Sequence, residues 1–259
     1  MRPRNEGSAT AAAQLAAGPS PLSEGKTMRI TIFGANGPTG RQLTAQALAA
    51  GHQVAAVTRQ PGEFPLRHDR LEVIGADVLD PGAVDTAVKG RDAVLSALGV
   101  PPSKEPITTY SDGVSNIVTA MRRHGVGRVV VVSSAGVDPR PYSEGGFLFN
   151  RLLVPYVTRV AGKTLYDDMR RMESLLRDSD RDWTVVRPSG LYDRPDVTDY
   201  TMVEGHADGI FTARSDLAAS MLAAVTEGRF VRAAAGVITT DSGNPTLLRW
   251  IRQQASADH

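Results

Sequence analysis

The stretch Gly34-Ala35-Asn36-Gly37-Pro38-Thr39-Gly40 decides the fold of this 259-residue chain. It follows the run Arg29-Ile30-Thr31-Ile32-Phe33, which is short, rich in β-formers and typical of a buried strand. Residues 39–50 carry apolar side chains on one helical face. Glycines between a strand and a helix let the backbone approach a pyrophosphate, which then meets the free N–H groups of the helix N-terminus. The stretch therefore predicts a dinucleotide site. The alternative is an ordinary glycine-rich turn.

Downstream, strand-like and helix-like segments alternate. Strands are expected at residues 53–58, 71–75, 92–96, 129–132, 183–186 and, more weakly, 236–239. Helices are expected from Asp80-Pro81, with the aspartate as N-cap, and over residues 109–124, 163–177 and 215–226, the first of these three capped by Thr108 or Thr109. The alternation predicts one Rossmann-type domain of the α/β class, with a doubly wound parallel sheet and helices on both faces. The strand-poor last third is expected to cap the far end of the sheet.

The composition excludes several kinds of chemistry. The net charge is +1, whereas a nucleic-acid-binding protein normally carries a basic excess, so no nucleic-acid partner is expected. The absence of cysteine excludes disulfides, thiol nucleophiles and iron–sulfur ligation. The histidines do not sit at metal-ligand spacing, so no metal site is expected. No apolar run approaches the roughly 20 residues of a membrane span. We therefore expect a cytoplasmic protein with no membrane partner.

Residues 1–27 differ from the rest of the chain. They are rich in Ala, Gly, Ser and Pro and contain no aromatic residue, so we expect a disordered tail. A secretory signal is the alternative, but the stretch from Ala9 to Ala17 is weakly hydrophobic and is interrupted by Gln14. Met28 directly precedes the first strand. We therefore expect the folded domain to span residues 28–259, behind a tail that comes from an upstream start codon.

The end of the second strand bears on cofactor choice. A site for NAD places an acidic residue there to bind the ribose 2′-hydroxyl. This chain has Thr58 and Arg59, and its nearest acid is Glu63. An arginine at this point can pair with a 2′-phosphate, so Thr58 and Arg59 predict NADP(H). Arg59 as a solvated loop charge is the alternative. Asp77, after the third strand, is placed either to accept from the adenine amino group or to close a turn.

Residues 28–259 resemble the NAD(P)H-binding branch of the atypical short-chain dehydrogenase/reductase superfamily, in the NmrA-like neighbourhood. They are similar to flavin reductase and biliverdin-IXβ reductase proteins. The resemblance rests on these stretches: Gly34–Gly40, Val57-Thr58-Arg59, Gly75-Ala76-Asp77-Val78, Ser96-Ala97-Leu98-Gly99, Thr108-Thr109-Tyr110-Ser111-Asp112-Gly113 with Asn116-Ile117-Val118, Val131-Val132-Ser133-Ser134-Ala135, Asp167-Asp168 with Arg171-Met172, and Asp182-Trp183-Thr184-Val185-Val186-Arg187-Pro188. It implies a one-domain Rossmann fold, NADP(H) binding and hydride transfer to a flat conjugated acceptor.

The same resemblance implies roles for individual residues. The pyrophosphate would be wrapped by Gly34, Asn36, Gly37, Pro38, Thr39 and Gly40. Arg59 would hold the adenosine phosphate. The adenosine and the nicotinamide ribose would lie beside Ala97, Leu98 and Gly99. Ser133 and Ser134 would stand at the nicotinamide, and Pro188 and Ser189 would close over it.

Catalytic residues are scarce in this sequence. Typical members of the superfamily use Tyr-x-x-x-Lys, in which the lysine lowers the pKa of the tyrosine on the same helix face. Here Tyr166 and Arg170 have that spacing but lie one residue out of the expected register. Tyr166 is thus a candidate proton donor, and the alternative is that it packs while Arg170 is solvated. Ser134 is the other catalytic candidate. Glu173 stands where similar proteins carry a histidine, which disfavours a tetrapyrrole substrate.

Residues 138–164 and 191–211 are expected to form the substrate side. The first segment gathers four of the few aromatic residues, namely Tyr142, Phe147, Phe149 and Tyr156. Such side chains suit a pocket for a flat, apolar small molecule. The alternative is a lid helix that packs its own core.

Two functions of different kinds fit these features. The first is an NADPH-dependent oxidoreductase, a monomer or small homo-oligomer, that transfers a hydride to a small flavin- or quinone-like acceptor. The alternative is a non-catalytic NADP(H)-binding redox-sensing regulator that acts through a protein partner. A sugar-nucleotide epimerase would need the Tyr–Lys pair and a larger C-terminal domain, and we find neither in the sequence.

Overall fold

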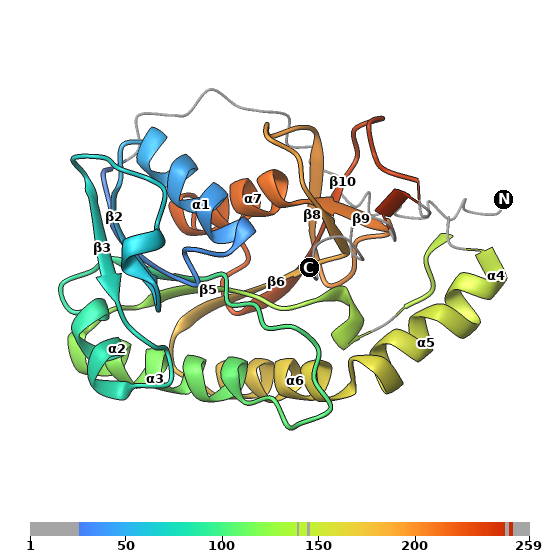
Figure 1. Ribbon diagram of the computed structural model, residues 1–259, viewed down its shortest axis with the longest axis horizontal. Helices are drawn as coiled ribbons and strands as arrows, with labels where there is room; N and C mark the ends of the chain where they lie inside the picture. The colour runs from blue at the N-terminus through green and yellow to red at the C-terminus, as the bar shows by residue number, and fades with distance from the viewer. Residues whose placement is uncertain (1–25, 139, 144–145, 247–248, 251–259) are drawn as a thin grey trace, which may run out of the picture.

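The computed structural model describes residues 26–138, 140–143, 146–246 and 249–250, and its centre is an eight-stranded sheet (Figure 1). The strand order is β3-β2-β1-β4-β5-β6-β10-β8. All neighbouring strands are parallel except β8, which runs antiparallel to β10 at one edge. The strands are β1 Arg29–Phe33, β2 Gln53–Thr58, β3 Leu71–Gly75, β4 Ala93–Ser96, β5 Arg128–Val132, β6 Asp182–Pro188, β8 Tyr200–Glu204 and β10 Ala233–Thr239. The predicted Rossmann-type sheet is confirmed.

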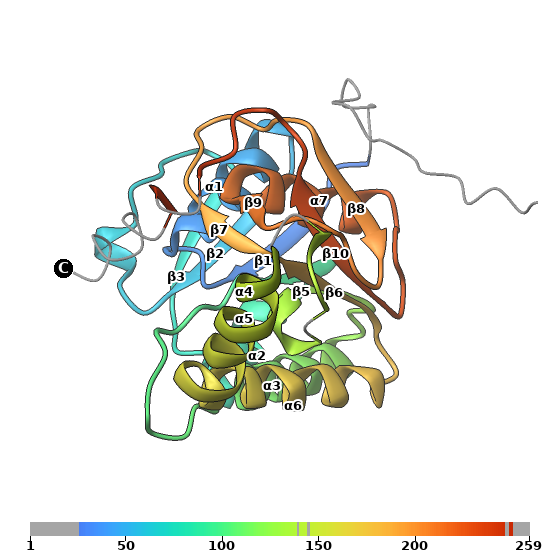
Figure 2. The ribbon, with the colours of Figure 1, turned by 90° about the vertical axis from the view of Figure 1, so that its right-hand side faces the viewer.

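Helices cover both faces of this sheet, as Figures 1 and 2 show. One face carries α1 Pro38–Ala49 and α7 Arg214–Thr226, which pack against each other. The other face carries α2 Pro81–Val88, α3 Thr109–His124 and α6 Lys163–Arg177. Each face has its own hydrophobic core. A sheet covered in this way buries both faces of a strand, which explains the uninterrupted valine run of β5.

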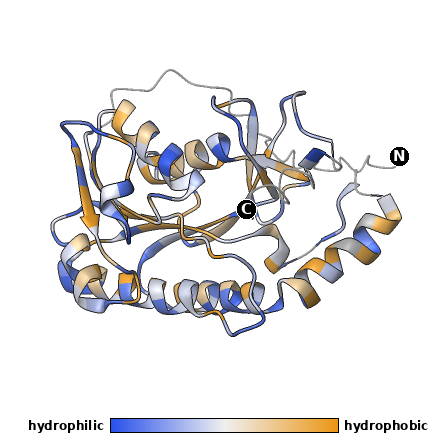
Figure 3. Ribbon diagram, viewed as in Figure 1, coloured by the Kyte–Doolittle hydropathy of each residue, from blue (hydrophilic) through white to orange (hydrophobic). Residues whose placement is uncertain are grey.

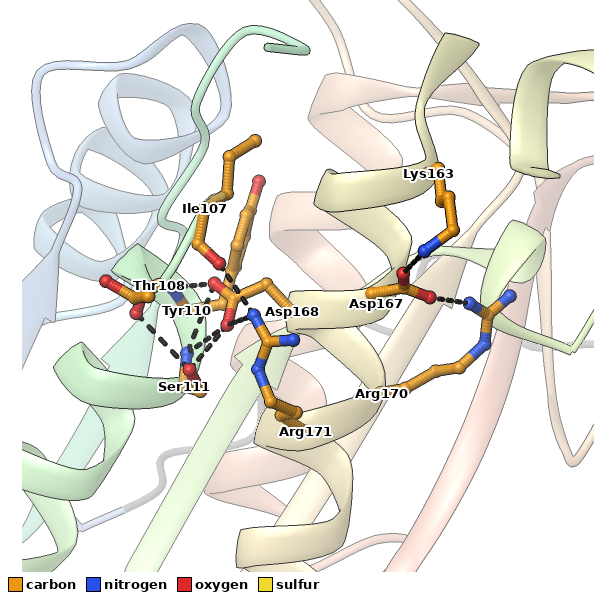
Figure 4. Close-up of polar contacts among 9 residues, drawn as sticks. All are labelled: Ile107, Thr108, Tyr110, Ser111, Lys163, Asp167, Asp168, Arg170 and Arg171. Atoms are coloured by element: carbon orange, nitrogen blue, oxygen red, sulfur yellow. Dashed lines mark hydrogen bonds and ion pairs between the residues drawn. The ribbon is translucent and has the colours of Figure 1, made fainter. Parts of the chain in front are cut away.

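Two helix caps test the predicted start signals. Asp80 caps α2 as expected, since its Oδ1 accepts from the N–H groups of Gly82 and Ala83 at 2.9 and 3.3 Å. The predicted cap of α3 is wrong, because no hydrogen bond joins the side chain of Thr108 or Thr109 to an N–H of that helix. The cap comes instead from Asp168, which lies on the neighbouring α6 (Figure 4). The capping side chain is 58 positions away from Tyr110 in the sequence, so the residues next to the helix do not indicate it.

The C-terminal third contains more strands than predicted. The last predicted strand is the longer β10, and β8 extends the sheet beyond it. A separate small sheet pairs β7 Gly190–Tyr192 with β9 Phe211–Ala213 in parallel. The expectation of a strand-poor cap is therefore wrong in detail. Strands of three residues are too short to show an alternating pattern.

A helical arm joins β5 to α6 and projects past the end of the sheet (Figure 1). It runs from Gly146 to Ala161 and alternates between α-helical and π-helical turns. Its pieces are α4 Gly146–Leu148, a π-helical turn Phe149–Leu153, α5 Val154–Tyr156 and a second π-helical turn Val157–Ala161. Pro155 lacks the N–H that a regular helix needs, which accounts for part of this irregularity. Short 3-10 turns occur at Pro61–Glu63 and Ala135–Val137.

The predicted disordered tail lies outside the described residues, except for its last two positions. None of the helices in the described ranges is long and apolar enough to cross a membrane.

Candidate functional site

A cleft of about 1000 Å³ opens along the carboxyl ends of the parallel strands. It crosses the point between β1 and β4 where the strand order reverses, which is where ligands bind in open α/β sheets. Every residue predicted from the sequence to bind the cofactor or to act in catalysis lines this cleft except Gly40. The cleft is also lined by residues to which no role was assigned from the sequence, including Tyr110, Leu165, Met169, Arg214 and Trp250. Within the described ranges, no three His, Asp or Glu residues gather to hold a metal ion.

Two glycines shape the loop between β1 and α1. Gly34 has a φ of +72°, and a Cβ there would lie 2.6 Å from the carbonyl oxygen of Ala97. A side chain at Gly34 would therefore clash with the loop that follows β4. At Gly40 a Cβ would lie 2.2 Å from the carbonyl oxygen of Gly34. Gly40 thus allows α1 to pack closely against the loop, and it does so from behind the cleft wall.

The first turn of α1 fits a dinucleotide pyrophosphate. No side chain caps this helix, and its first residue, Pro38, has no N–H. The N–H groups of Thr39 and Gly40 donate to no acceptor among the described residues. Helix N-termini with free N–H groups bind anions through those groups and the helix dipole. Asn36 steadies the loop by accepting a hydrogen bond from Nε of Arg41 at 3.0 Å.

The end of the cleft beside β2, where the sequence predicts the adenosine, carries a positive charge without a protein partner in the described ranges. Arg59 is exposed, lines the cleft, and makes no hydrogen bond or ion pair with any described residue. Thr58 accepts from the N–H of Gln60 at 3.1 Å and so closes the turn after β2. Glu63 does not line the cleft, and its carboxylate accepts a hydrogen bond from the side-chain amide of Gln60. Asp77 lines the cleft while its Oδ1 accepts from the N–H of Leu79 at 2.9 Å, so its turn role is observed.

Two serines follow β5 at the other end and point to different partners. Ser133 is buried and donates to Oε1 of Glu173 at 2.7 Å. Glu173 is itself held by the guanidinium of Arg187, with 3.0 Å between Nε and Oε1. Ser134 instead accepts from the N–H of Gly136 at 3.2 Å. Ser133 is thus tied into a buried ion pair behind the cleft, and Ser134 is the hydroxyl beside Tyr166.

Tyr166 lies in the cleft in spite of its shifted register. Its ring packs on Gly136, where a Cβ would come within 2.4 Å of it. Burial raises the pKa of Tyr166, while a hydrogen bond with Ser134 and the charge of Arg170 act in the opposite direction. Arg170 is not simply solvated, since its Nε donates to the carbonyl of Val137 at 3.1 Å. The tyrosine therefore carries its proton at neutral pH.

The outer part of the cleft is apolar. The arm contributes Val154 and Val157, and the segment around the small sheet contributes Leu191, Ile210 and Phe211. Parts of both predicted substrate segments thus reach the cleft. Of the four aromatic residues in the first segment, Tyr142 lines the cleft, and the Phe149 side chain lies outside the described residues.

The other two aromatic residues, Phe147 and Tyr156, face solvent with 73% and 59% of their surface exposed. They neither line the cleft nor pack a core of the arm. Trp250 closes one wall of the cleft by donating from its indole to the carbonyl of Leu191 at 2.8 Å. No local sequence pattern indicates that Trp250 lies on the cleft wall.

Comparison with known proteins agrees with this geometry. A family model described as NAD(P)H-binding matches residues 34–228, which is more than half of the chain. The chain belongs to this family. Its cofactor is therefore NAD(P)(H), and the first turn of α1 fits that group.

Three known proteins illustrate what the chain is similar to. An uncharacterised protein of Mycobacterium tuberculosis is 40% identical over 114 residues, which cover 44% of this chain and only 13% of that protein. The 2-alkyl-3-oxoalkanoate reductase of Stenotrophomonas maltophilia is 32% identical over 122 residues, or 44% of this chain and 35% of that one. A short-chain dehydrogenase/reductase from Veillonella parvula, solved in complex with NADP, shares the fold with a TM-score of 0.70 at 23% identity. That match covers 86% of this chain and all of the other.

Proposed function

We propose that the protein is an NADPH-dependent reductase that transfers a hydride to a small conjugated acceptor of the flavin or quinone type. One observation carries this proposal. A single cleft is lined at its proposed adenosine end by Arg59, which has no partner among the described residues, and at the opposite end by Ser134 and Tyr166. The cleft then continues into an apolar mouth, which suits a flat ligand.

The preference for NADPH rests on Arg59. A guanidinium with no partner in the described part of the chain is available to a 2′-phosphate, which it can bind through paired, charge-assisted hydrogen bonds. An NAD site would place a carboxylate at this point, and Glu63 lies off the cleft. The Veillonella protein, which has the same fold and was solved in complex with NADP, supports this choice.

The chain's own residues supply orientation and a proton. The cofactor provides the hydride when it is bound. Ser134 and Tyr166 hold a polar atom of the acceptor by hydrogen bonds. As that atom gains negative charge, neutral Tyr166 donates its proton to it. The nearby charge of Arg170 stabilises the tyrosinate that remains, since it lowers the pKa of Tyr166. One similar protein, the Stenotrophomonas enzyme, is named as a reductase, which supports a reduction as the reaction class.

Oxidation of NADPH in the presence of FMN, riboflavin and quinones tests the proposal. We expect saturable loss of the reduced-nicotinamide absorbance with at least one acceptor. Tyr166→Phe should slow it by about a hundredfold, as expected for loss of a proton donor. Tyr156→Phe is the matched control, because this exposed tyrosine lies off the cleft, and it should retain the wild-type rate. Tight NADPH binding with no turnover across the panel would overturn the reductase and favour the redox-sensing regulator.

Two further expectations concern the whole protein. We expect this reductase to act in the cytoplasm. A chain without cysteine forms no disulfides, so it does not need an oxidising compartment. We also expect a monomer or a small homo-oligomer, which sedimentation velocity would decide.

A further inference from the structure

The helical arm carries a row of apolar side chains that face solvent. Leu148, Leu152, Tyr156 and Val160 follow one another every four residues, and 59–68% of each is exposed. Together with Phe147 we call them the outer ridge. Other exposed large apolar residues of the described chain, away from the arm, are less exposed, at 41–45%, and stand apart from one another in sequence. Figure 3 shows hydrophobic positions along the arm, which projects from the rest of the molecule. Contiguous exposed apolar surface of this kind marks an interaction site.

Positive charge runs beside the outer ridge. Arg151 and Arg159 are exposed on the same arm and make no hydrogen bond or ion pair with any described residue. Lys163 continues this row and pairs with Asp167 at 2.6 Å. The sequence from 146 to 162 contains no acidic residue. The arm therefore offers apolar side chains flanked by uncompensated positive charge.

This combination fits an anionic lipid surface better than a second copy of the chain. Amphipathic segments with arginine beside Phe, Leu and Tyr lie in the interface of a bilayer, where anionic headgroups meet the positive charges. A two-fold contact between arms would bring their arginines together, and the arm has no carboxylate to separate them. A stable protein interface also needs about 20–30 residues on each side. The outer ridge has five.

We propose that the outer ridge docks the protein on an anionic membrane surface. The opposite side of the same arm contributes Val154, Val157 and Thr158 to the cleft. Docking would therefore bring the apolar mouth of the cleft close to the bilayer. Docking in this orientation would make a lipid-soluble acceptor accessible to the cleft, and this consequence rests on the proposed reductase function. Docking itself does not depend on that function. The sequence lacks an apolar run long enough to span a membrane, and this does not exclude docking on its surface.

Co-sedimentation of the full chain with vesicles tests the proposal. We expect binding to vesicles of phosphatidylcholine with phosphatidylglycerol and little binding to phosphatidylcholine alone. The double variant Arg151→Gln/Arg159→Gln should lower the partition by about 25-fold, from about fivefold for each arginine. Lys89→Gln/Arg177→Gln removes the same charge from exposed positions elsewhere and should bind like the wild type.

A second pair of variants tests the apolar part. Leu152→Ser/Val160→Ser should lower the partition by at least about tenfold, because two side chains no longer enter the interface. The control Val197→Ser/Val231→Ser changes exposed apolar residues away from the arm and should have no effect. NADPH titration of every variant checks the fold and separates loss of docking from failure of the reductase function.

Three outcomes would overturn docking. The wild type could remain in the supernatant with both kinds of vesicle. The control variants could lose as much binding as the arm variants. Sedimentation velocity could instead show a dimer that Leu152→Ser/Val160→Ser dissociates, which would assign the outer ridge to a second copy of the chain.

Discussion

Asp168 should contribute far more to stability than its neighbour Asp167. The side chain of Asp168 is completely buried, and its carboxylate accepts from the N–H groups of Tyr110 and Ser111 at 2.8 and 3.3 Å. It also accepts from the Ser111 hydroxyl and from the guanidinium of Arg171, the latter at 3.1 Å. The bonds tie α6 to the first turn of α3, as Figure 4 shows. We consider the truncation Asp168→Ala.

The expected loss is about 3 kcal/mol. Loss of the capping bond to the N–H of Ser111 costs about 1 kcal/mol. A buried N–H left without an acceptor, here that of Tyr110, adds about 1–3 kcal/mol. The pair with Arg171 adds little, since more than half of that arginine side chain is exposed. A chain of this size shifts its melting temperature by roughly 2–4 °C for each kcal/mol. The variant should therefore melt about 6–12 °C below the wild type.

Urea unfolding followed by circular dichroism measures the effect, and Asp167→Ala provides the control. Asp167 lies one position earlier on α6 and pairs with Lys163 and Arg170 at the surface, where such pairs contribute up to about 1 kcal/mol (Figure 4). The difference between the two variants isolates the cap. Equal losses in the two would show that Asp168 does not tie the helices together, and the reasoning from burial and bonding would be refuted.

Three further changes probe the cofactor end, the buried tyrosine and the buried ion pair. Arg59→Asp should weaken NADPH binding by at least about tenfold in a fluorescence titration and barely change NADH binding, because it removes the phosphate partner; equal loss for both would show that Arg59 does not read the phosphate. Burial raises the pKa of Tyr110 from 10.0 to about 12. The folded chain then keeps a proton that the unfolded chain releases, so stability is full below about pH 10 and falls toward pH 12 by about 1.4 kcal/mol per pH unit. Tyr110→Phe should remove that part of the alkaline loss, and an unchanged alkaline profile would contradict the buried tyrosine as its source. Glu173→Ala leaves the guanidinium of Arg187 without its main partner and should destabilise the fold by about 3 kcal/mol in urea unfolding; a loss below about 1 kcal/mol would mean that Arg187 finds water or another partner.

The sheet and the cofactor end of the cleft could be predicted because their signals are local. A glycine-rich turn between a strand and a helix has few alternatives, and the residues that follow parallel strands meet at one edge. The bounds of β2, β3, α3 and α6 were predicted to the residue.

The remaining features depend on contacts between distant segments. The cap of α3 comes from Asp168, 58 positions from Tyr110, so no pattern near the helix could reveal it. The same holds for Trp250 on the cleft wall and for the link between Ser133 and Glu173. The role of Gly40 in packing α1 against the loop was also not predicted, since a motif does not say which glycine is required for close packing. The short strands β7 and β9 carry too few residues for any period to show.

In the proposed reductase the two ends of one cleft act together in reduction. The most direct test mixes the NADPH-bound protein anaerobically with a quinone or flavin and follows the reduced-nicotinamide absorbance in a single turnover. We expect a decay that is about a hundredfold slower in Tyr166→Phe, with NADPH affinity unchanged. An absorbance that stays constant in the wild type while NADPH remains bound would contradict it.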